Sequence, residues 1–232
     1  MRRIAYDIHV HSCLSPCGDN DMTPCNIAGM AHLNGLELVA LTDHNTTGNC
    51  PAFEKACAEY GIETLCGMEL TTAEEIHLMC IFADAKQAAR FEEAVLPYRM
   101  KVKNRKEIFG EQLILNERDE VIGEEPYLLP IATGLGLEDA ASLVWEHGGV
   151  AYPAHIERES NGILSVLGAL PQKPAFETVE CVNTAEFAQL NKRKVVSSDA
   201  HRLWELKDSS NTVLIGDEGT IKEAMMAYLG GL

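Results

Sequence analysis

The chain has 232 residues, of which 46% are hydrophobic, enough for one globular domain with a sizeable core. No apolar run approaches the roughly 18 residues that a membrane helix needs, and the N-terminus becomes polar too early for a signal peptide. We therefore expect a cytoplasmic protein without a membrane partner. The formal net charge of −16 argues against extensive binding of duplex DNA, which requires a basic surface. A small phosphorylated substrate remains compatible with this charge, because bound divalent cations can reverse the local potential.

The eight cysteines contain no CxxC pair. The chain is too large and too poor in cysteine for a secreted disulfide scaffold. We expect mostly reduced cysteines that pack as small hydrophobic side chains.

Strands and helices alternate along the chain. Strands are predicted over residues 4–10, 36–42, 62–70, 76–83, 149–155, 175–181, 195–201 and 211–216. Helices are predicted over 23–35, 51–61, 137–149, 185–194 and 220–231, the first with Thr23 as its N-cap and Pro24 at its first position. Apolar strands separated by helices indicate a parallel sheet covered by helices, and about seven such units favour a closed barrel.

Residues 85–137 interrupt this alternation. They begin with a long, charged helical stretch and continue into an irregular segment rich in Glu, Pro and Gly. We interpret this part as a mostly helical insertion that caps the site, within a single domain over residues 1–232.

Histidines and carboxylates recur where predicted strands end. Because the C-terminal strand ends of a parallel barrel converge on one mouth, these side chains are expected to meet there. In the HVH sequence, alternate strand residues point to one side and can bind one ion. The sequence therefore predicts a metal site from His9, His11, His44, Glu69, His155, Asp199 and His201.

Two further residues accompany this pattern. His77 begins a predicted strand instead of ending one, so its position alone leaves both a ligand role and a structural role open. Asp43 precedes His44 and is a candidate for orienting an imidazole by a hydrogen bond.

The motifs HVH, TDH, a lone Glu, PAH and SDAH, in this order, resemble the PHP family of metal-dependent phosphoesterases over about residues 4–215. The resemblance implies an α/β fold, a distorted seven-stranded β/α barrel with a trinuclear metal cluster at its mouth. The chain is most similar to small stand-alone members that act on nucleotide phosphates and carry an insertion between the early and late motifs.

The resemblance also implies how the ligands divide among three ions. His9, His11, Glu69 and Asp199 would hold the first ion; Glu69, His77 and His155 the second; His44 and His201 the third.

The third ion needs one more ligand. The family uses a His or Asp shortly after the HxH motif, but this chain has SPCGDND there. Counting back from Thr23-Pro24, the usual helix opening, selects Asp19. Cys17 and Asp21 remain alternatives.

Six imidazoles and three carboxylates suit Zn²⁺, Mn²⁺ or Fe²⁺ better than Mg²⁺, which prefers oxygen ligands. Two ions that share Glu69 are expected to share a bridging hydroxide that attacks phosphorus. Glu69, His155 and Asp199 would act through that hydroxide. The third ion would neutralise charge on the non-bridging oxygens.

Four residues are candidates for substrate binding. Arg158 and Arg202 each follow a metal motif, Arg105 lies in the insertion, and Asn45 follows TDH. They favour a nucleotide substrate of the nucleoside 3′,5′-bisphosphate type. A histidinol-phosphate-type phosphomonoesterase and a 5′→3′ exonuclease on short RNA share the same ligands and remain alternatives. The alternative outside enzymes is a regulatory metal-binding module.

Overall fold

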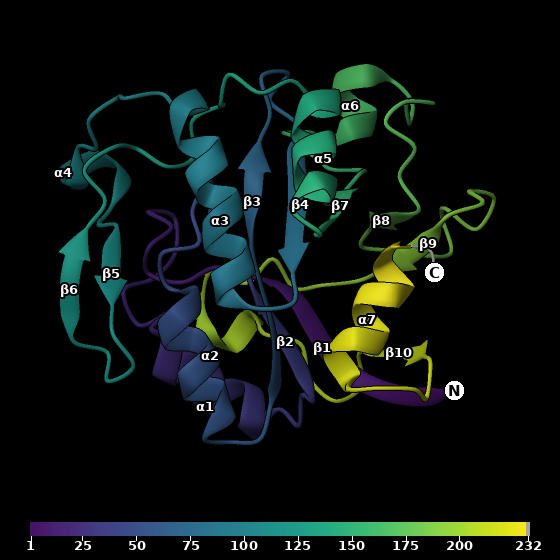
Figure 1. Ribbon diagram of the computed structural model, residues 1–232, viewed down its shortest axis with the longest axis horizontal. Coiled ribbons are helices and arrows are strands. Elements are labelled where there is room, and N and C mark those ends of the chain that lie inside the picture. The colour runs from purple at the N-terminus through teal and green to yellow at the C-terminus, as the bar shows by residue number, and fades with distance from the viewer. Residues whose placement is uncertain (231–232) are drawn as a thin grey trace.

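The computed structural model describes residues 1–230, which form a mixed α/β fold built on one six-stranded sheet (Figure 1). The strand order is β10-β1-β2-β3-β4-β7. The strands are β1 (Arg2–Val10), β2 (Leu38–Leu41), β3 (Glu63–Thr71), β4 (His77–Phe82), β7 (Val150–Pro153) and β10 (Thr212–Ile215). No helix in this part of the chain is both long and apolar enough to cross a bilayer.

The sheet is mixed, so the expected parallel sheet is corrected. β1, β2 and β3 are parallel, whereas β4 runs antiparallel to both β3 and β7, and β10 runs antiparallel to β1. β4 runs antiparallel to β3 because only residues 72–76 connect the two strands. Parallel neighbours would need a crossover of a dozen residues or more. Thr71, the last residue of β3, thereby pairs with His77, the first residue of β4.

Four helices cover the outer face of the sheet: α1 (Pro24–Leu33), α2 (Cys50–Ala58), α3 (Ala85–Val95) and α5 (Leu137–Glu146). Their buried side chains form one hydrophobic core with that face, for example Ile27, Phe53 and Phe91. The Thr23 hydroxyl accepts a hydrogen bond from the Asn26 amide, which confirms the predicted helix start with Pro24 in the first turn.

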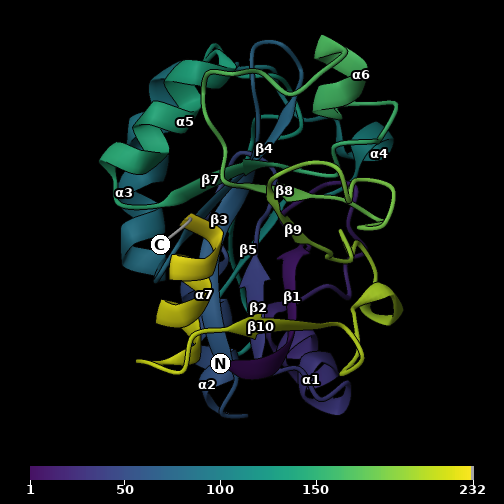
Figure 2. The same ribbon diagram turned by 90° about the vertical axis from the view of Figure 1, so that its right-hand side faces the viewer.

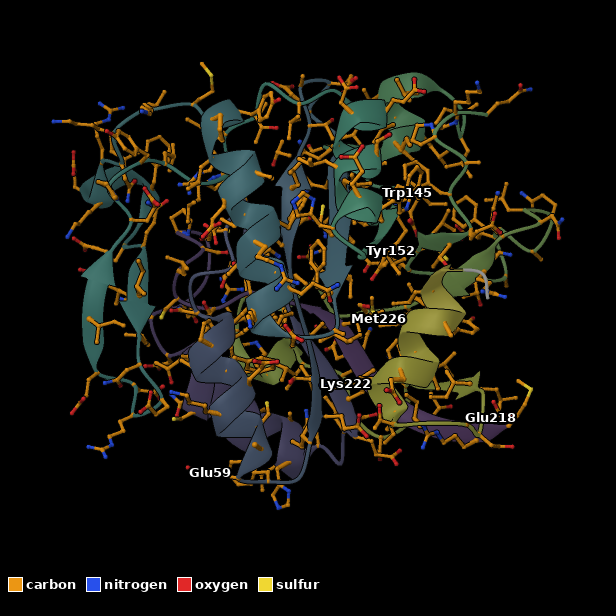
Figure 3. All side chains as sticks on the ribbon, viewed as in Figure 1. Glu59, Trp145, Tyr152, Glu218, Lys222 and Met226 are labelled. Atoms are coloured by element: carbon orange, nitrogen blue, oxygen red, sulfur yellow. The ribbon has the colours of Figure 1, made fainter. Side chains whose placement is uncertain are left out.

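The inner face of the sheet has a core of its own. Tyr6, Leu65 and Tyr152 pack there with Met225 of α7 (Ile221–Gly230). Figure 2 shows the sheet curling around this side, and Figure 3 places Tyr152 on β7 and Met226 on α7. The predicted last residue of this helix, Gly231, lies outside the described residues.

The curled sheet is a half-barrel of six strands. β8 (Thr178–Glu180) and β9 (Arg193–Val195) form a separate parallel pair, and a single bridge joins Val10 to Ala200. The expected seven strands are therefore not found in one sheet of the described chain.

Residues 85–137 contain less helix than expected. α3 belongs to the outer core, and a 3₁₀ turn over Leu96–Tyr98 ends it, because Pro97 has no backbone N–H to continue the helical hydrogen bonds. The remainder holds the short α4 (Lys106–Phe109) and a hairpin of β5 (Leu113–Leu115) and β6 (Val121–Glu124).

Two predictions for the late chain are wrong. Residues 185–192 form turns and bends in place of a helix, with the Leu190 amide bonded to the Phe187 carbonyl three residues back (2.9 Å), and residues 193–194 belong to β9. Of the strand expected over 195–201, only residue 195 lies in a strand, at the end of β9. The strand stops there because the Tyr6 hydroxyl accepts from the amide of residue 196 and the Asp7 carboxylate accepts from the amide of residue 198. The structure adds the short α6 (Ile163–Leu167) and a 3₁₀ turn over Leu203–Glu205.

Candidate metal centre

Eight of the nine predicted metal ligands meet at one end of the curled sheet. β1, β3 and β4 supply His9, Glu69 and His77, and loops that follow strands supply the other five. The eight residues, which we call the metal centre, are His9, His11, His44, Glu69, His77, His155, Asp199 and His201. All are buried except Asp199 and His201, which are half-buried.

The first ligand group has the spacing of a coordination shell. His11 Nε2 lies 3.1 Å from Asp199 Oδ1 and 3.3 Å from Glu69 Oε2. His9 Nε2 lies 3.2 Å from Asp199 Oδ1 and 3.1 Å from His11 Nε2. Four donors at about 2.0 Å from a tetrahedral ion stand roughly 3.3 Å apart. These side chains therefore surround a point suited to one divalent ion.

A second group forms around the other oxygen of Glu69. Glu69 Oε1 lies 2.6 Å from His77 Nδ1 and 3.0 Å from His155 Nε2, and the two nitrogens are 3.3 Å apart. The antiparallel course of β4 explains the place of His77. The start of an antiparallel strand lies beside the C-terminal ends of its neighbours, so a strand-opening histidine joins strand-closing ones.

The third group contains His11, His44 and His201, whose ligand atoms lie within 4.8 Å of one another. Asp19 is absent from this group: its side chain is exposed and lies 3.6 Å from Arg202 Nε, while its amide donates to the His201 carbonyl (2.9 Å). The exposed Cys17 lies close enough for its thiol to interact with the His44 imidazole. Asp21 is exposed, and its carbonyl accepts from the Asn26 side chain.

Buried atoms without partners provide a test of whether this centre fits metal ions. Within the described residues, His44 Nδ1, Glu69 Oε2, His155 Nδ1 and Asp199 Oδ1 are buried without a hydrogen bond. An unpaired buried polar atom costs on the order of 1–3 kcal/mol, and here four occur among residues that ligate metals elsewhere. Imidazole and carboxylate donors suit Zn²⁺, Mn²⁺ or Fe²⁺, so the residues fit divalent ions.

The imidazoles of the centre differ in charge. Burial disfavours a charged His9, but the surrounding carboxylates, beginning with Glu180, raise the pKa of His9 well above its ordinary value. Burial is likewise outweighed at His11 and His44, where carboxylate contacts, together with Cys17 at His44, raise the pKa of each imidazole to about 9. Burial and the neighbouring His11 lower the pKa of His201 to about 3.

The carboxylates of the centre are ionised. Burial acts to raise the pKa of Glu69, but the charges of His77 and His9 hold that pKa well below its ordinary value. At Asp199 burial is again outweighed, by His9 and then His11, so the pKa of this carboxyl is also lowered. Glu69 and Asp199 therefore offer two negative charges to a cation, which replaces the protons of the neighbouring imidazoles.

Backbone strain gathers at the same place. His155 has φ of 26° and Asp199 has φ of 54°, in the left-handed region that residues with a Cβ seldom adopt. Such conformations cost about 1–3 kcal/mol each and persist where the surrounding structure fixes them, often at functional sites.

Glu180, at the end of β8, is a site residue that the sequence reasoning missed. Its buried carboxylate accepts a hydrogen bond from His9 Nδ1 (3.0 Å) and another from the His155 amide (3.1 Å). Glu180 lies one residue before the end of the strand predicted over 175–181, close to where several predicted ligands lie on theirs, and this was the signal that could have found it. It holds a proton on His9 Nδ1 and so directs Nε2 to the centre.

Asp43 orients an imidazole, as predicted, but acts through a serine. Its Oδ1 accepts from the Ser15 hydroxyl (2.7 Å), which lies 3.0 Å from His11 Nδ1. The chain from Asp43 through Ser15 thus fixes the ring of His11, the histidine shared by two ligand groups.

The predicted substrate-binding residues differ in where they lie. The Arg158 guanidinium reaches Asp199 Oδ2 (2.5 Å), so it lies at the edge of the centre, as Arg202 does through Asp19. Arg105 lies over the Phe109 ring, 6.0 Å from its centroid.

Asn45 has a structural role in place of the substrate contact we expected. Its side-chain amide donates to the carbonyls of Leu129 (2.6 Å) and Ile131 (3.0 Å), and its oxygen accepts from the Thr71 amide (2.9 Å). The residue is 1% exposed, so these backbone contacts occupy the polar atoms predicted to meet substrate.

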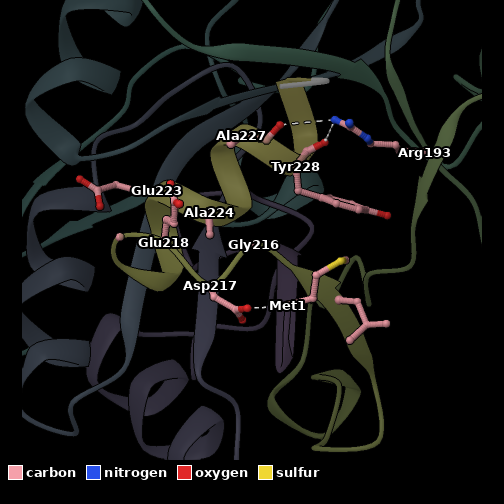
Figure 4. Close-up of a pocket in the computed structure, with 11 residues that line it drawn as sticks. Met1, Arg193, Gly216, Asp217, Glu218, Glu223, Ala224, Ala227 and Tyr228 are labelled. Carbon is pink, nitrogen blue, oxygen red and sulfur yellow. Dashed lines mark hydrogen bonds and ion pairs between the residues drawn. The ribbon is translucent and has the colours of Figure 1, made fainter.

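A cavity of about 840 Å³ lies elsewhere, between the N-terminus, β10 and α7 (Figure 4). Met1, Arg193, Asp217 and Tyr228 are among the residues that line it, and none of the metal-centre residues does. Arg193 donates there to the carbonyls of Ala227 and Tyr228, which gives its charge a structural partner at the end of a helix.

Comparison with known proteins yields one family and several relatives. A model of the PHP domain matches residues 7–127. The 5′-3′ exoribonuclease of Haemophilus influenzae is 35% identical over 77 residues, which make up 32% of this chain and 27% of that protein. The chain thus aligns with much less than the full length of this relative.

Solved structures share the fold at low identity. Endonuclease Q of Pyrococcus furiosus aligns with all of this chain and 56% of its own, with a TM-score of 0.65 and 18% identity. A complex of endonuclease Q with a 27-mer duplex, which has an abasic lesion at the active site, has a TM-score of 0.63. A "putative metal-dependent phosphoesterase" of Bifidobacterium adolescentis aligns over 98% of this chain and 96% of its own, with a TM-score of 0.61 and 18% identity.

Proposed function

The chain belongs to the PHP domain family of metal-dependent phosphoester hydrolases, and we propose that it hydrolyses a phosphoester of a nucleotide, of the nucleoside 3′,5′-bisphosphate type. The observation that carries the proposal is the metal centre, where buried carboxylate and imidazole atoms face one another at the spacing of metal ligands. A regulatory module would not need to keep so many competent ligands together at the cost of unpaired buried atoms.

We propose that the metal centre holds three divalent ions, Zn²⁺, Mn²⁺ or Fe²⁺. Such ions supply Lewis acidity toward a phosphoryl group and lower the pKa of a coordinated water. Glu69 connects two ligand groups through its two oxygens, and Glu180 accepts from His9 Nδ1, so that His9 Nε2 faces the other ligands. Asp19 remains our proposed last ligand of the third group, with Cys17 and Asp21 as the alternatives.

Arginines at the edge of the centre support recognition of phosphate. The Arg158 side chain is 47% exposed and the Arg202 side chain 51%, and each contacts a carboxylate at the rim. A guanidinium can bind two phosphate oxygens at once. We propose that Arg158 and Arg202 exchange these contacts for the non-bridging oxygens of the substrate.

A second candidate function is a 5′→3′ exonuclease on short RNA. The similarity to the Haemophilus influenzae exoribonuclease favours it, although that similarity covers only 27% of the relative. The endonuclease Q complex shows that a protein of this fold can bind a duplex. The expectation that this chain does not bind duplex DNA therefore stays a prediction.

Phosphate release by protein loaded with Mn²⁺ tests the proposed function. The substrates are adenosine 3′,5′-bisphosphate, AMP, histidinol phosphate and a short RNA, and the matched control is His9→Ala. Release from the bisphosphate above the other substrates, and its loss in the control, is the expected result. Preference for the RNA would favour the second candidate, and preference for histidinol phosphate would overturn the nucleotide assignment. Equal release by the control would show that the metal centre is not the site of reaction.

A further inference from the structure

Residues 98–109 form an exposed segment rich in positive charge, which we call the cationic segment. It contains five of the 19 Lys and Arg residues of a chain with net charge −16, and only one carboxylate, Glu107. The cations are Arg99, Lys101, Lys103, Arg105 and Lys106. A cluster of positive charge on a negatively charged protein attracts a polyanion to that place, while the remaining surface repels it.

Three of these cations lack a carboxylate partner. Arg99 is taken up by Glu92 and Glu125, and Lys106 pairs with Glu124. Within residues 1–230, Lys101, Lys103 and Arg105 form no ion pair and are exposed. Their charge is available to a ligand.

Large apolar side chains alternate with these cations. Tyr98, Met100, Val102, Ile108 and Phe109 are 41–56% exposed. Phe109 lies beside the Arg105 guanidinium, an arrangement in which a ring and a planar cation present adjacent flat surfaces. Alternating cations and apolar or aromatic groups are the features by which proteins bind single strands, because bases stack while the phosphates meet cations.

The cationic segment is attached to the loops that supply metal ligands. Gly110, directly after it, approaches Pro16 so closely that a Cβ would lie 2.3 Å from the Pro16 carbonyl oxygen. Pro16 belongs to the loop between His11 and α1, and the Leu113 amide donates to Cys13 of the same loop (3.1 Å). The cationic segment is therefore held against the loop that follows His11.

A second attachment leads to His44. The Leu128 amide donates to the Val102 carbonyl (2.8 Å), and the next residue, Leu129, is held by the Asn45 side chain. Asn45 directly follows His44. Two short backbone routes thus link the cationic segment to ligands of the third group, and Figure 1 shows α4 beside the hairpin of β5 and β6.

We propose that the cationic segment binds the backbone of a single-stranded oligonucleotide whose terminal phosphoester lies at the metal centre. This inference rests on the proposed function and extends its substrate class from a mononucleotide to a short strand. Lys101, Lys103 and Arg105 bind phosphates beyond the scissile one, and the exposed apolar side chains contact bases. A duplex buries its bases and cannot use these side chains.

Binding of a fluorescein-labelled oligonucleotide of about 12 nucleotides, within the site sizes of single-strand binders, tests the proposal. Phosphorothioate linkages slow its hydrolysis by the Mn²⁺-loaded protein, and fluorescence anisotropy reports Kd across a series of salt concentrations. The variant is Lys101→Glu, Lys103→Glu, Arg105→Glu. The matched control is Lys86→Glu, Arg90→Glu, Lys173→Glu, which changes the net charge equally at exposed positions outside the cationic segment.

The first variant should weaken binding at least about tenfold and reduce the salt slope by about 2, because each phosphate contact on a single strand contributes about 0.7. The control should stay within about twofold, and both should keep the thermal midpoint of the parent. Equal weakening in the control, no weakening in the variant, or tighter binding of a matched duplex would overturn the proposal.

Turnover separates this proposal from the one on which it rests. Hydrolysis of the bisphosphate with oligonucleotide binding unaffected by the three reversals would refute the role of the cationic segment and leave the proposed function in place. Oligonucleotide binding through the cationic segment without hydrolysis of any nucleotide would support the role of the cationic segment and refute the proposed function.

Discussion

The metal centre and the cationic segment differ in how completely the protein organises their polar groups. In the metal centre, the rings of His9 and His11 are fixed from behind by Glu180 and by the Asp43–Ser15 pair. In the cationic segment, Lys101, Lys103 and Arg105 are exposed and form no ion pair within the described residues. Chemistry requires donors fixed to within fractions of an ångström, whereas electrostatic capture of a flexible strand requires charge and access. Mutations should therefore affect the two regions very differently.

The largest effect is expected at Glu69, whose oxygens lie within 3.4 Å of atoms from five histidines. Glu69→Gln keeps the shape but removes the charge and one acceptor oxygen from two ligand groups. We expect phosphate release to fall by about 10³-fold or more, with bound metal also reduced. Elemental analysis and steady-state kinetics measure both. Turnover within a few-fold of the parent would remove Glu69 from the site.

A smaller effect is expected at Glu180, which supports His9 without belonging to a ligand group. Loss of such a supporting hydrogen bond typically costs about 10–100-fold in metal affinity or activity. Glu180→Ala should show this loss in a competition titration with a chelator. Glu180→Gln should recover part of it, because its amide oxygen can still accept from His9 Nδ1. Identical affinities in both variants and the parent would contradict the supporting role.

Protonation of the centre should make metal binding depend on pH. The pKa of His11 and of His44 is raised to about 9 from 6.5 in the metal-free protein, so both carry protons at pH 7. Their contribution to stability is complete below pH 6.5 and is lost as pH rises through about 9. Metal must displace these protons, so affinity should tighten from pH 7 to pH 9.

Calorimetry at pH 7 in buffers of different ionisation enthalpy measures the protons released on metal binding. Release from these two imidazoles should fall to about half near pH 9, where each is half protonated, and fall further above it. Binding without proton release at pH 7 would show that these imidazoles are neutral before the metal arrives.

The smallest effect concerns the last ligand of the third group, which is the most exposed part of the centre. Asp19→Ala should lower the metal content by about one ion per chain, whereas Cys17→Ala should leave it unchanged. The reverse result would assign the position to Cys17, whose thiol interacts with the His44 imidazole. Native mass spectrometry counts the ions in each variant.

The sequence was most informative where local rules and the site coincide. Thr23 and Pro24 mark a helix start, and the strand-end positions of His9, His44 and His155 follow from the convergence of strand ends. The antiparallel course of β4 was not predicted, and it alone explains why His77, at a strand start, joins them. Pairing direction depends on contacts distant in sequence, which a local pattern does not contain.

Other failures have the same origin. Glu180 interacts with His9 across 171 positions in the sequence, and no local motif announces that contact. Asn45 was predicted to meet substrate because it follows TDH, yet its amide is used up by carbonyls of residues 129 and 131. Residues 185–194 have a helical composition, but form turns and bends up to residue 192 and then enter the short β9.

Anomalous diffraction from crystals of the full chain grown with Mn²⁺, with data collected on both sides of the manganese edge, tests the central claim most directly. The account predicts a peak enclosed by His9, His11, Glu69 and Asp199, a second beside Glu69, His77 and His155, and a third beside His44 and His201. Soaking with an excess of Mn²⁺ that yields no peak among these side chains would contradict it.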